Sequence, residues 1–274
     1  MVGPGDFGLT LCEWGPTSGR ATVLLHGFLE QGAAWEVVAR GLNRRVAAPD
    51  LRGHGRSDAV GPGGWYHFWD YVADVDGLLH EFDAPVDLVG HSMGGLVALL
   101  LAATRPARIH KLVAIEGLGP PDTTTHAVDR AIQFLDHRRD VPRHVRLTDL
   151  DDAVRRISRG APKMDRALAR ELAARITTED ASGSGLQWTW DALHRGRSPT
   201  PFSSAQASAF LSRIDAPTLL IDGAETAFQV EDHAQRAAAI PSAGHVVIPG
   251  AGHLVHHDAP AALIQALMAF LDAP

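Results

Sequence analysis

Cysteine is almost absent from this chain, since Cys12 is the only one in 274 residues. A single cysteine excludes an intramolecular disulfide. Cys12 lies in a strand-like stretch, Leu9-Thr-Leu-Cys-Glu13, where a cysteine serves best as a small buried apolar residue. We therefore expect it to be structural, and not a catalytic thiol.

An excess of basic residues is also absent. Lys and Arg number 25 against 32 Asp and Glu, which gives a formal net charge of -7. Binding to nucleic acid calls for a basic patch, and the Arg-rich zone around Arg138–Arg159 is better explained by solvated helix faces. We expect no nucleic-acid partner.

Long apolar runs are missing as well. A membrane helix needs about 18 uninterrupted apolar residues, and the apolar stretch Leu96–Ala103 is far shorter. The segment Met1–Asp6 has neither the basic start nor the apolar run of a signal peptide. These absences predict a soluble cytoplasmic protein with no membrane partner.

Short apolar runs alternate with helical patterns along most of the chain, without an internal repeat. Such runs are typical of buried parallel strands, and the alternation predicts an α/β fold with a mostly parallel central sheet flanked by helices. The predicted strands are Thr22–Leu25, Val46–Ala48, Val86–Val89, Lys111–Ile115, Thr218–Ile221 and His245–Ile248. The predicted helices are Trp35–Leu42, Phe68–Phe82, Met93–Thr104, Val230–Ala239 and Ala259–Leu271.

The alternation breaks once, between Gly117 and Arg213, where we predict no strand. This part of the chain favours a helical cap insertion, residues 118–212, in a core made of residues 1–117 and 213–274. Ligands of open parallel sheets bind at the carboxyl ends of the strands, which such an insertion would cover. The helices predicted in it are Ala127–Arg138, Leu150–Ser158 and Asp165–Ile176.

Ser92 is the candidate nucleophile. The motif Gly90-His-Ser-Met-Gly94 matches G-x-S-x-G, and it stands between a predicted strand and a predicted helix, as that motif requires. A serine on such a sharp turn has its hydroxyl lifted clear of the sheet, and small residues two positions away on either side avoid collisions. The Met93 N–H at the start of the helix would favour a developing anion.

A second glycine-bearing turn, His26-Gly-Phe28, ends the strand Thr22–Leu25. It lies where the second donor of an oxyanion hole is needed, and we predict the N–H groups of Phe28 and Met93 as the two donors. His26 is better explained as a residue that fixes this loop through hydrogen bonds than as a general base.

Taken in order, the turn after the first parallel strand, the loop Asp50-Leu-Arg-Gly-His-Gly-Arg-Ser-Asp58 and the motif around Ser92 resemble the α/β-hydrolase superfamily. The segments Gly61–Tyr71 and Lys111–Gly117 are similar to the serine hydrolase-like proteins within it. This resemblance covers nearly the whole chain outside the insertion. It implies an α/β-hydrolase fold and an activated serine, and says little about the substrate.

The resemblance places the catalytic histidine after the last strand, at Gly250-Ala-Gly-His253. We therefore predict His253 as the general base of Ser92. His256 and His257 follow closely, but no ligating Glu or Cys pattern accompanies them, so we expect no metal site and no cofactor. These two histidines fit the start of the next helix.

The acid of the expected triad is harder to place. After strand Thr218–Ile221 the usual acid position falls on Thr226, while Glu225 is one residue early and Asp222 precedes the glycine. Glu116, at the carboxyl end of strand Lys111–Ile115, is our preferred acid, and Glu225 is the alternative. A carboxylate is needed there to orient and stabilise the imidazole. Three other carboxylates, Asp74, Asp76 and Asp87, are expected to be solvated.

Most aromatic residues of the Trp65–Tyr71 cluster are expected in the core, while Trp188 and Trp190 are candidates for an apolar acyl pocket. The predicted function is hydrolysis of a carboxylic ester or related small-molecule acyl substrate through an acyl-enzyme. The alternatives are a carbon–carbon bond hydrolase, a cofactor-free haloperoxidase-like enzyme, and a non-catalytic small-molecule binding protein on the same fold. The sequence gives no oligomeric state.

Overall fold

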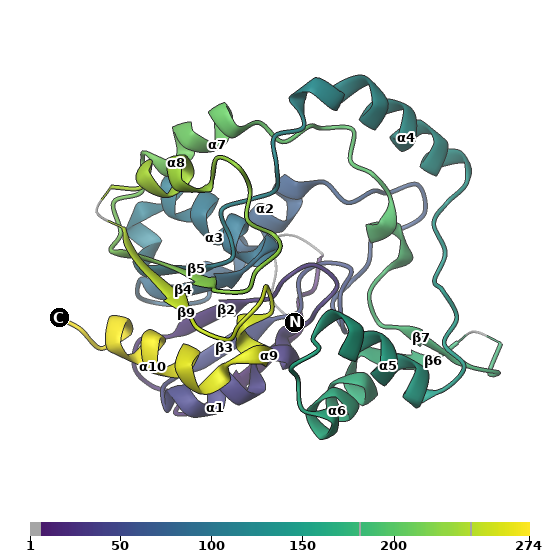
Figure 1. Ribbon diagram of the computed structural model, residues 1–274, viewed down its shortest axis with the longest axis horizontal. Coiled ribbons are helices and arrows are strands. Elements are labelled where there is room, and N and C mark those ends of the chain that lie inside the picture. The colour runs from purple at the N-terminus through teal and green to yellow at the C-terminus, as the bar shows by residue number, and fades with distance from the viewer. Residues whose placement is uncertain (1–6, 181, 242) are drawn as a thin grey trace.

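The computed structural model describes residues 7–180, 182–241 and 243–274. Residues 1–6, where the sequence predicts no signal peptide, lie outside this range. A central sheet dominates the molecule, with strand order β1-β3-β2-β4-β5-β8-β9 (Figure 1). Its strands are β1 (Leu11–Trp14), β2 (Thr22–Leu25), β3 (Val46–Pro49), β4 (Val86–His91), β5 (Ile109–Ile115), β8 (Thr218–Gly223) and β9 (Gly244–Ile248).

All neighbouring strands of this sheet are parallel except β1, which pairs antiparallel with β3. The α/β-hydrolase architecture predicted from the sequence is therefore confirmed. The six predicted strands agree with β2, β3, β4, β5, β8 and β9 to within two residues at either end. The outermost strand β9 is largely exposed, because a strand at the edge of a sheet has a neighbour on one side only.

Two apolar layers hold helices against the two faces of the sheet. On one face pack α2 (Phe68–Leu79), α3 (Met93–Thr104), α7 (Ser204–Leu211) and α8 (His233–Ala238), and on the other α1 (Glu36–Leu42), α9 (Val255–Asp258) and α10 (Pro260–Leu271) (Figure 1). Helix α3 is almost wholly buried, so its apolar residues face neighbours on all sides. Because α3 follows β4 directly, this burial fixes the turn between them.

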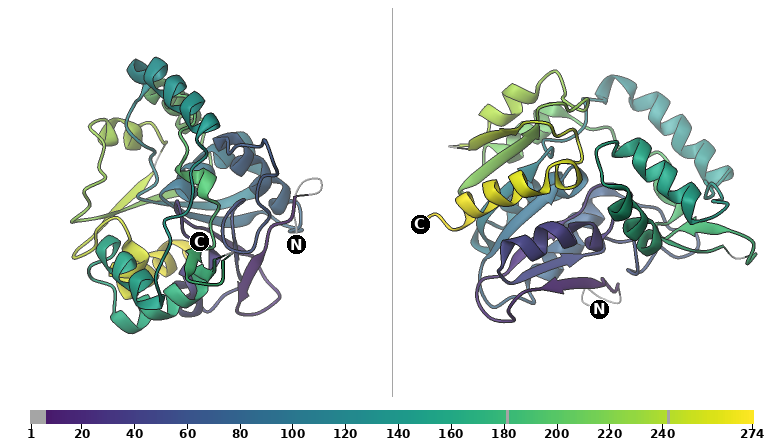
Figure 2. Two further views of the ribbon diagram at one scale, coloured as in Figure 1. Left: turned by 90° about the vertical axis from the view of Figure 1, so that its right-hand side faces the viewer. Right: turned by 60° about the horizontal axis from the view of Figure 1, so that its bottom comes forward.

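Residues 118–212 contain α4 (Ala127–Arg139), α5 (Leu150–Gly160) and α6 (Arg166–Ile176), close to the predicted bounds, and also α7, which packs on the sheet. Helices α5 and α6 share a small apolar core of their own. Figures 1 and 2 show this part of the chain beside one end of the sheet. Short 3₁₀ turns occur at Gly32–Trp35, Pro106–Arg108, Thr124–His126 and Ala192–Arg195.

The prediction that this segment contains no strand is wrong. Strands β6 (Thr177–Glu179) and β7 (Leu186–Trp188) form an antiparallel pair. Each has three residues, too few to show the period-two pattern by which strands are recognised in a sequence. The two β-branched threonines of β6 are the local signal that favours it.

Two predicted solvated carboxylates are buried instead. Asp74 pairs through both oxygens with Arg52, and Asp87 lies between Arg44 (2.9 Å) and His110 (2.7 Å). Their partners are distant in sequence, so local patterns give no sign of these pairs. Of the three predicted carboxylates, Asp76 stays partly exposed, with Arg105 as its partner.

Cys12 is half-buried, and not fully buried as predicted, because β1 is an edge strand. Within the described residues, no helix has the length and apolar character needed to cross a bilayer.

Candidate active site

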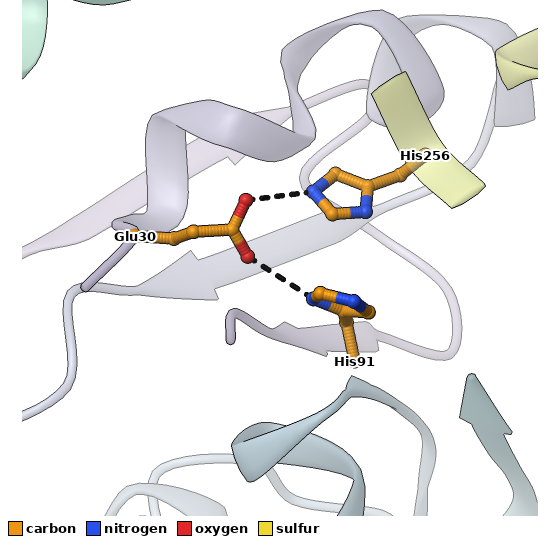
Figure 3. A group of neighbouring side chains, drawn as sticks. All are labelled: Glu30, His91 and His256. Atoms are coloured by element: carbon orange, nitrogen blue, oxygen red, sulfur yellow. Dashed lines mark hydrogen bonds and ion pairs between the residues drawn. The ribbon is translucent and has the colours of Figure 1, made fainter. Parts of the chain in front are cut away.

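Ser92 lies on the sharp turn between β4 and α3, with a φ of 50°, in the left-handed region that serine rarely adopts. The turn holds because its flanking glycines allow backbone to approach backbone. A Cβ on Gly90 would lie 2.2 Å from the carbonyl oxygen of Gly94, and one on Gly94 would lie 2.5 Å from that of Leu25. The neighbouring His91 points toward Glu30 (Figure 3).

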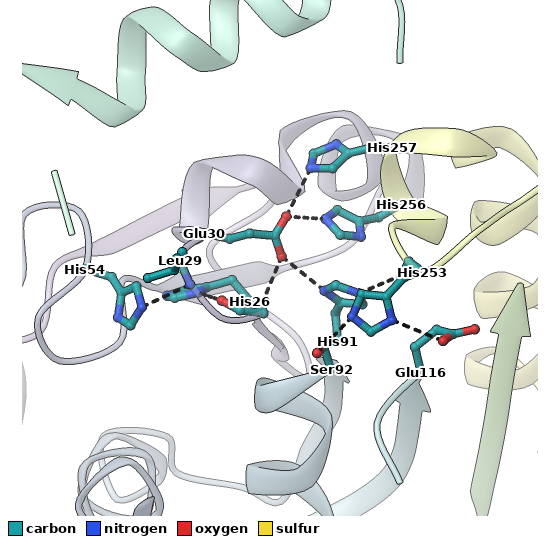
Figure 4. A network of polar contacts seen from close by, with 11 residues as sticks. His26, Leu29, Glu30, His54, His91, Ser92, Glu116, His253, His256 and His257 are labelled. Atoms are coloured by element: carbon teal, nitrogen blue, oxygen red, sulfur yellow. Dashed lines mark hydrogen bonds and ion pairs between the residues drawn. The ribbon is translucent and has the colours of Figure 1, made fainter. Parts of the chain in front are cut away.

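The side chain of His253 lies next to the serine hydroxyl (Figure 4). Its Nε2 is 3.0 Å from Oγ of Ser92, and its Nδ1 is 3.1 Å from Oε2 of Glu116. The three residues follow three strand ends: Ser92 comes directly after β4, Glu116 directly after β5, and His253 lies in the loop after β9. Glu116, like Ser92, has a positive φ, 51°. Backbone strain of this kind gathers at functional sites.

Glu116 is buried and fully partnered. Its Oε1 accepts a hydrogen bond from the Gly223 N–H (2.7 Å), and its Oε2 accepts one from the Thr226 hydroxyl (2.7 Å) besides facing His253. Burial alone would raise the pKa of this carboxyl. The hydrogen bonds from His253, Thr226 and Gly223, together with the charge of His253, nevertheless hold the pKa below its usual value. Glu116 is therefore ionised at neutral pH.

The alternative acid, Glu225, has a different partner. Its carboxylate pairs with Nζ of Lys163 at 2.6 Å, and its side chain is 58% exposed. The adjacent Thr226 stands at the usual acid position, where sequence reasoning saw only a missing carboxylate. In the structure its hydroxyl binds Glu116, so this position still contributes to the site. The sequence does place Thr226 at the usual acid position, and this was the sign that the residue belongs to the site.

The residues of the two predicted oxyanion donors line the same cavity as Ser92, with Met93 directly after the serine and Phe28 in the loop after β2. Among the residues that the structure covers, neither the Phe28 N–H nor the Met93 N–H is used by a turn, a loop or a helix cap. His26 fixes the first loop as expected, since its Nε2 accepts a hydrogen bond from the Leu51 N–H at 2.9 Å. In the loop Asp50–Asp58, the Asp50 carboxylate accepts bonds from the N–H groups of Gly32 and Arg56.

Ser92, Met93, Phe28, Glu116 and His253 all line one cavity of about 830 Å³. Several aromatic side chains that the sequence assigned to the core contribute to its wall as well, and so do three arginines. These lining residues are Trp65, Tyr66, Phe68, Tyr71, Arg130, Arg195 and Arg197.

Trp188 and Trp190 line a different cavity, of about 490 Å³, which also touches α5 and α6. Their rings stack with centroids 6.5 Å apart. Phe28 borders both cavities, whereas Ser92 and His253 border only the first of these two. The structure therefore does not bring the two tryptophans to the serine.

Comparison with known proteins now decides the family. A family model described as the alpha/beta hydrolase fold matches residues 22–260. The chain belongs to the α/β-hydrolase family. This α/β-hydrolase is similar to a 3-hydroxybutyrate-oligomer hydrolase of Cupriavidus necator, with 29% identity over 95% of the chain and 92% of that protein. It is also similar to lipase LipV of Mycobacterium tuberculosis, with 39% identity over 38% of the chain and 40% of the lipase.

Among solved structures, this α/β-hydrolase resembles a thioesterase domain from the curacin biosynthetic pathway. The TM-score is 0.86 and the identity 33%, over 96% of each chain. The names of these relatives share one reaction class, the hydrolysis of acyl compounds.

Proposed function

We propose that this α/β-hydrolase cleaves carboxylic esters or related acyl substrates, with Ser92 as nucleophile, His253 as general base and Glu116 as the acid. One observation carries the proposal: the hydrogen-bonded chain from Ser92 Oγ through the His253 ring to Glu116. This is the arrangement in which a base activates a hydroxyl while a carboxylate orients the base. The lipase and hydrolase relatives support the same reaction class.

The proposed reaction has two halves. His253 takes the hydroxyl proton of Ser92 while Oγ attacks the substrate carbonyl, and the N–H groups of Phe28 and Met93 donate hydrogen bonds to the oxyanion. His253 then gives the proton to the leaving alcohol or thiol, which leaves an acyl-enzyme. In the second half His253 activates water, which attacks the acyl carbonyl and releases the acid. Each oxyanion donor contributes about 10²–10³ in rate.

Labelling with a fluorophosphonate probe tests the activated serine. The native protein is expected to incorporate one probe at Ser92, and Ser92→Ala to incorporate none and to lose hydrolysis of p-nitrophenyl esters by more than about 10³-fold. Native protein that takes up no probe and cleaves no ester would favour a binding protein on this fold. Labelling without ester cleavage would direct attention to carbon–carbon bond hydrolysis or haloperoxidase chemistry.

A substrate panel then defines the acyl group. It compares p-nitrophenyl esters of graded chain length with matched thioesters, because a thioesterase domain is among the similar structures. It also includes esters with a terminal carboxylate, since three arginine side chains line the cavity. Equal rates for all members of the panel would mean that this cavity does not select the acyl group.

A further inference from the structure

Three imidazole rings contact the carboxylate of Glu30, beside the proposed catalytic residues. Its Oε1 lies 3.0 Å from Nε2 of His256 and 3.1 Å from Nε2 of His257, and its Oε2 lies 3.0 Å from Nδ1 of His91. Figure 3 shows the rings of His91, from β4, and His256, from α9, pointing at the carboxylate. His91 and His256 are buried, with side chains only 1% exposed. The proposed reaction uses none of these side chains.

A neutral His91 ring would leave one of its contacts, that between Nδ1 and Glu30, without a hydrogen-bond donor. Its Nε2 lies 2.8 Å from the carbonyl oxygen of His253, which only accepts, so Nε2 carries the ring proton. In the neutral ring Nδ1 then has a lone pair, and this lone pair faces a carboxylate oxygen. That oxygen, Oε2 of Glu30, already accepts a hydrogen bond from the Gly27 N–H at 3.0 Å. A proton or a metal ion between Nδ1 and Oε2 would satisfy both atoms.

The arrangement of the donors fits a metal ion. Three ligand atoms, one each from Glu30, His91 and His256, lie within 4.8 Å of one another. Around a tetrahedral zinc ion, with bonds of about 2.0–2.2 Å, ligand atoms stand roughly 3.4 Å apart. The widest separation would therefore have to shorten by up to about 1.4 Å, and the two 3.0 Å contacts of Glu30 would have to lengthen by about 0.4 Å.

For His91 and Glu30 the outer contacts are also those that metal ligands need, whereas Nδ1 of the buried His256 has no hydrogen-bond partner among the described residues. A metal-bound histidine usually donates its second ring N–H to a carbonyl or carboxylate. The bond from His91 Nε2 to the His253 carbonyl does this, and the Gly27 N–H orients the carboxylate. Glu30 and His257 border the cavity of about 490 Å³, which gives an ion a path to the cluster.

We propose that Glu30, His91 and His256 bind one divalent transition-metal ion, of which Zn²⁺ is the representative, with His257 or water as fourth ligand. Two histidines and one carboxylate are an established ligand set for zinc. The sequence analysis expects no metal site because no Glu or Cys pattern lies near the histidines along the chain. In the structure the carboxylate comes from Glu30, 226 residues before His256. This inference does not depend on which bond the enzyme cleaves.

Metal titration of the whole protein, first freed of metal with a chelator, tests the site. Calorimetry with Zn²⁺ is expected to give one ion per chain, and Co²⁺ to give the visible absorption of a four-coordinate site. Glu30→Gln and His256→Gln are each expected to weaken binding at least about tenfold. Ser92→Ala, which removes only the proposed nucleophile, is expected to bind Zn²⁺ like the native protein.

His245→Gln is the matched control, because His245 pairs with a carboxylate elsewhere, that of Asp222 (2.7 Å). It is expected to retain the affinity for Zn²⁺. Unchanged binding in Glu30→Gln and His256→Gln, loss of binding in His245→Gln, or no saturable binding by native protein would each overturn the proposal.

Anomalous diffraction at the zinc edge from native crystals soaked in Zn²⁺ keeps the test valid if a variant does not fold. The proposal expects a peak about 2.0–2.2 Å from Nε2 of His256, Nδ1 of His91 and a Glu30 oxygen. A peak only at Asp222 and His245, or no peak, would refute it.

Discussion

At the scale of single residues, the position of the carboxylate is the least usual feature of the site. Glu116 comes from the end of β5, and Thr226, after β8, supports it with a hydroxyl. A carboxylate partner of a catalytic histidine holds the ring in the right tautomer and stabilises its charged form. Substitutions at Glu116, Glu225 and Thr226 separate the roles of these side chains.

Glu116→Gln is expected to lower kcat by about 10³–10⁴-fold, because an amide cannot stabilise the imidazolium and favours the wrong tautomer. Glu225→Gln, changed in the same way, is expected to alter kcat less than about twofold, since it removes only an exposed ion pair with Lys163. Steady-state kinetics with one ester compare the two. The opposite pattern would assign the acid to Glu225.

Thr226→Val keeps the shape of the side chain and removes the hydroxyl that donates to Glu116. Losing one hydrogen bond to a buried carboxylate costs about 1.5–3 kcal/mol. The hydroxyl also lowers the pKa of Glu116, so the activity of the variant is expected to fall off at higher pH on the acid side than that of native protein. Thr226→Ser, which restores the donor, is expected to return the native pH profile. Coinciding profiles for the valine variant and native protein would contradict this role.

The predictability of the site differs from residue to residue. Ser92 and Phe28 stand in local motifs that the sequence displays. The ion pairs of Asp74 and Asp87, and the cluster around Glu30, depend on partners that only the folded chain brings close. A sequence pattern reports only neighbours along the chain, so it does not predict these contacts.

At the scale of elements, the unit β4–turn–α3 is the best defined part of the molecule. The apolar sequences of the strand and of the helix both match their burial in the structure. The helix α3 begins and ends at the predicted residues, whereas the three-residue strands β6 and β7 were not foreseen. Elements long enough to show a period can be predicted, and shorter ones depend on the contacts around them.

Gly90→Ala tests this unit. The added methyl group would lie 2.2 Å from a backbone oxygen, so β4 and α3 would have to separate. We expect unfolding free energy to fall by about 1–3 kcal/mol or more, together with a loss of activity. Denaturant titration measures the first effect and ester hydrolysis the second.

The matched control is Gly160→Ala at the end of α5, where a Cβ meets nothing within 4 Å. It is expected to leave stability unchanged or to raise it by up to about 1 kcal/mol. Equal stability changes in the two variants would mean that close packing at the turn is unimportant.

At the scale of the whole molecule, we propose that residues 118–212 form a cap on a core of residues 1–117 and 213–274. The serine-bearing cavity supports this division, because its wall combines core residues with Arg130 and with residues 193–198. His194 joins the two parts. Its Nδ1 faces the Tyr71 hydroxyl at 3.0 Å, its Nε2 faces the Gly53 carbonyl at 3.1 Å, and its ring stacks on His54.

This joint is expected to weaken in acid. Burial lowers the pKa of His194 to about 4, from an ordinary value near 6.5. Between these values the unfolded chain binds the proton and the folded chain does not, so stability falls as pH drops from about 6.5 to 4. The full effect is at most roughly 3 kcal/mol. Urea titrations at pH 7, 6 and 5 measure it.

His194→Gln removes this titration, so its stability is expected to depend less on pH over the same interval. His126→Gln serves as control, because the side chain of His126 is 67% exposed and meets water in both states. Parallel curves for His194→Gln and native protein would show that His194 does not carry the acid sensitivity.

The origin of the proposed acid on β5 leaves the segment from Ala224 to Gln229 with an unusual freedom. In this segment only the hydroxyl of Thr226 binds Glu116, and Phe228 lies beside the His253 ring, with centroids 4.2 Å apart. A protein engineer can vary residues 227–229 and keep Thr226, whose hydroxyl supports the carboxylate. Libraries built there would reshape the rim of the cavity and keep measurable turnover, which makes this segment the natural place to retune substrate choice.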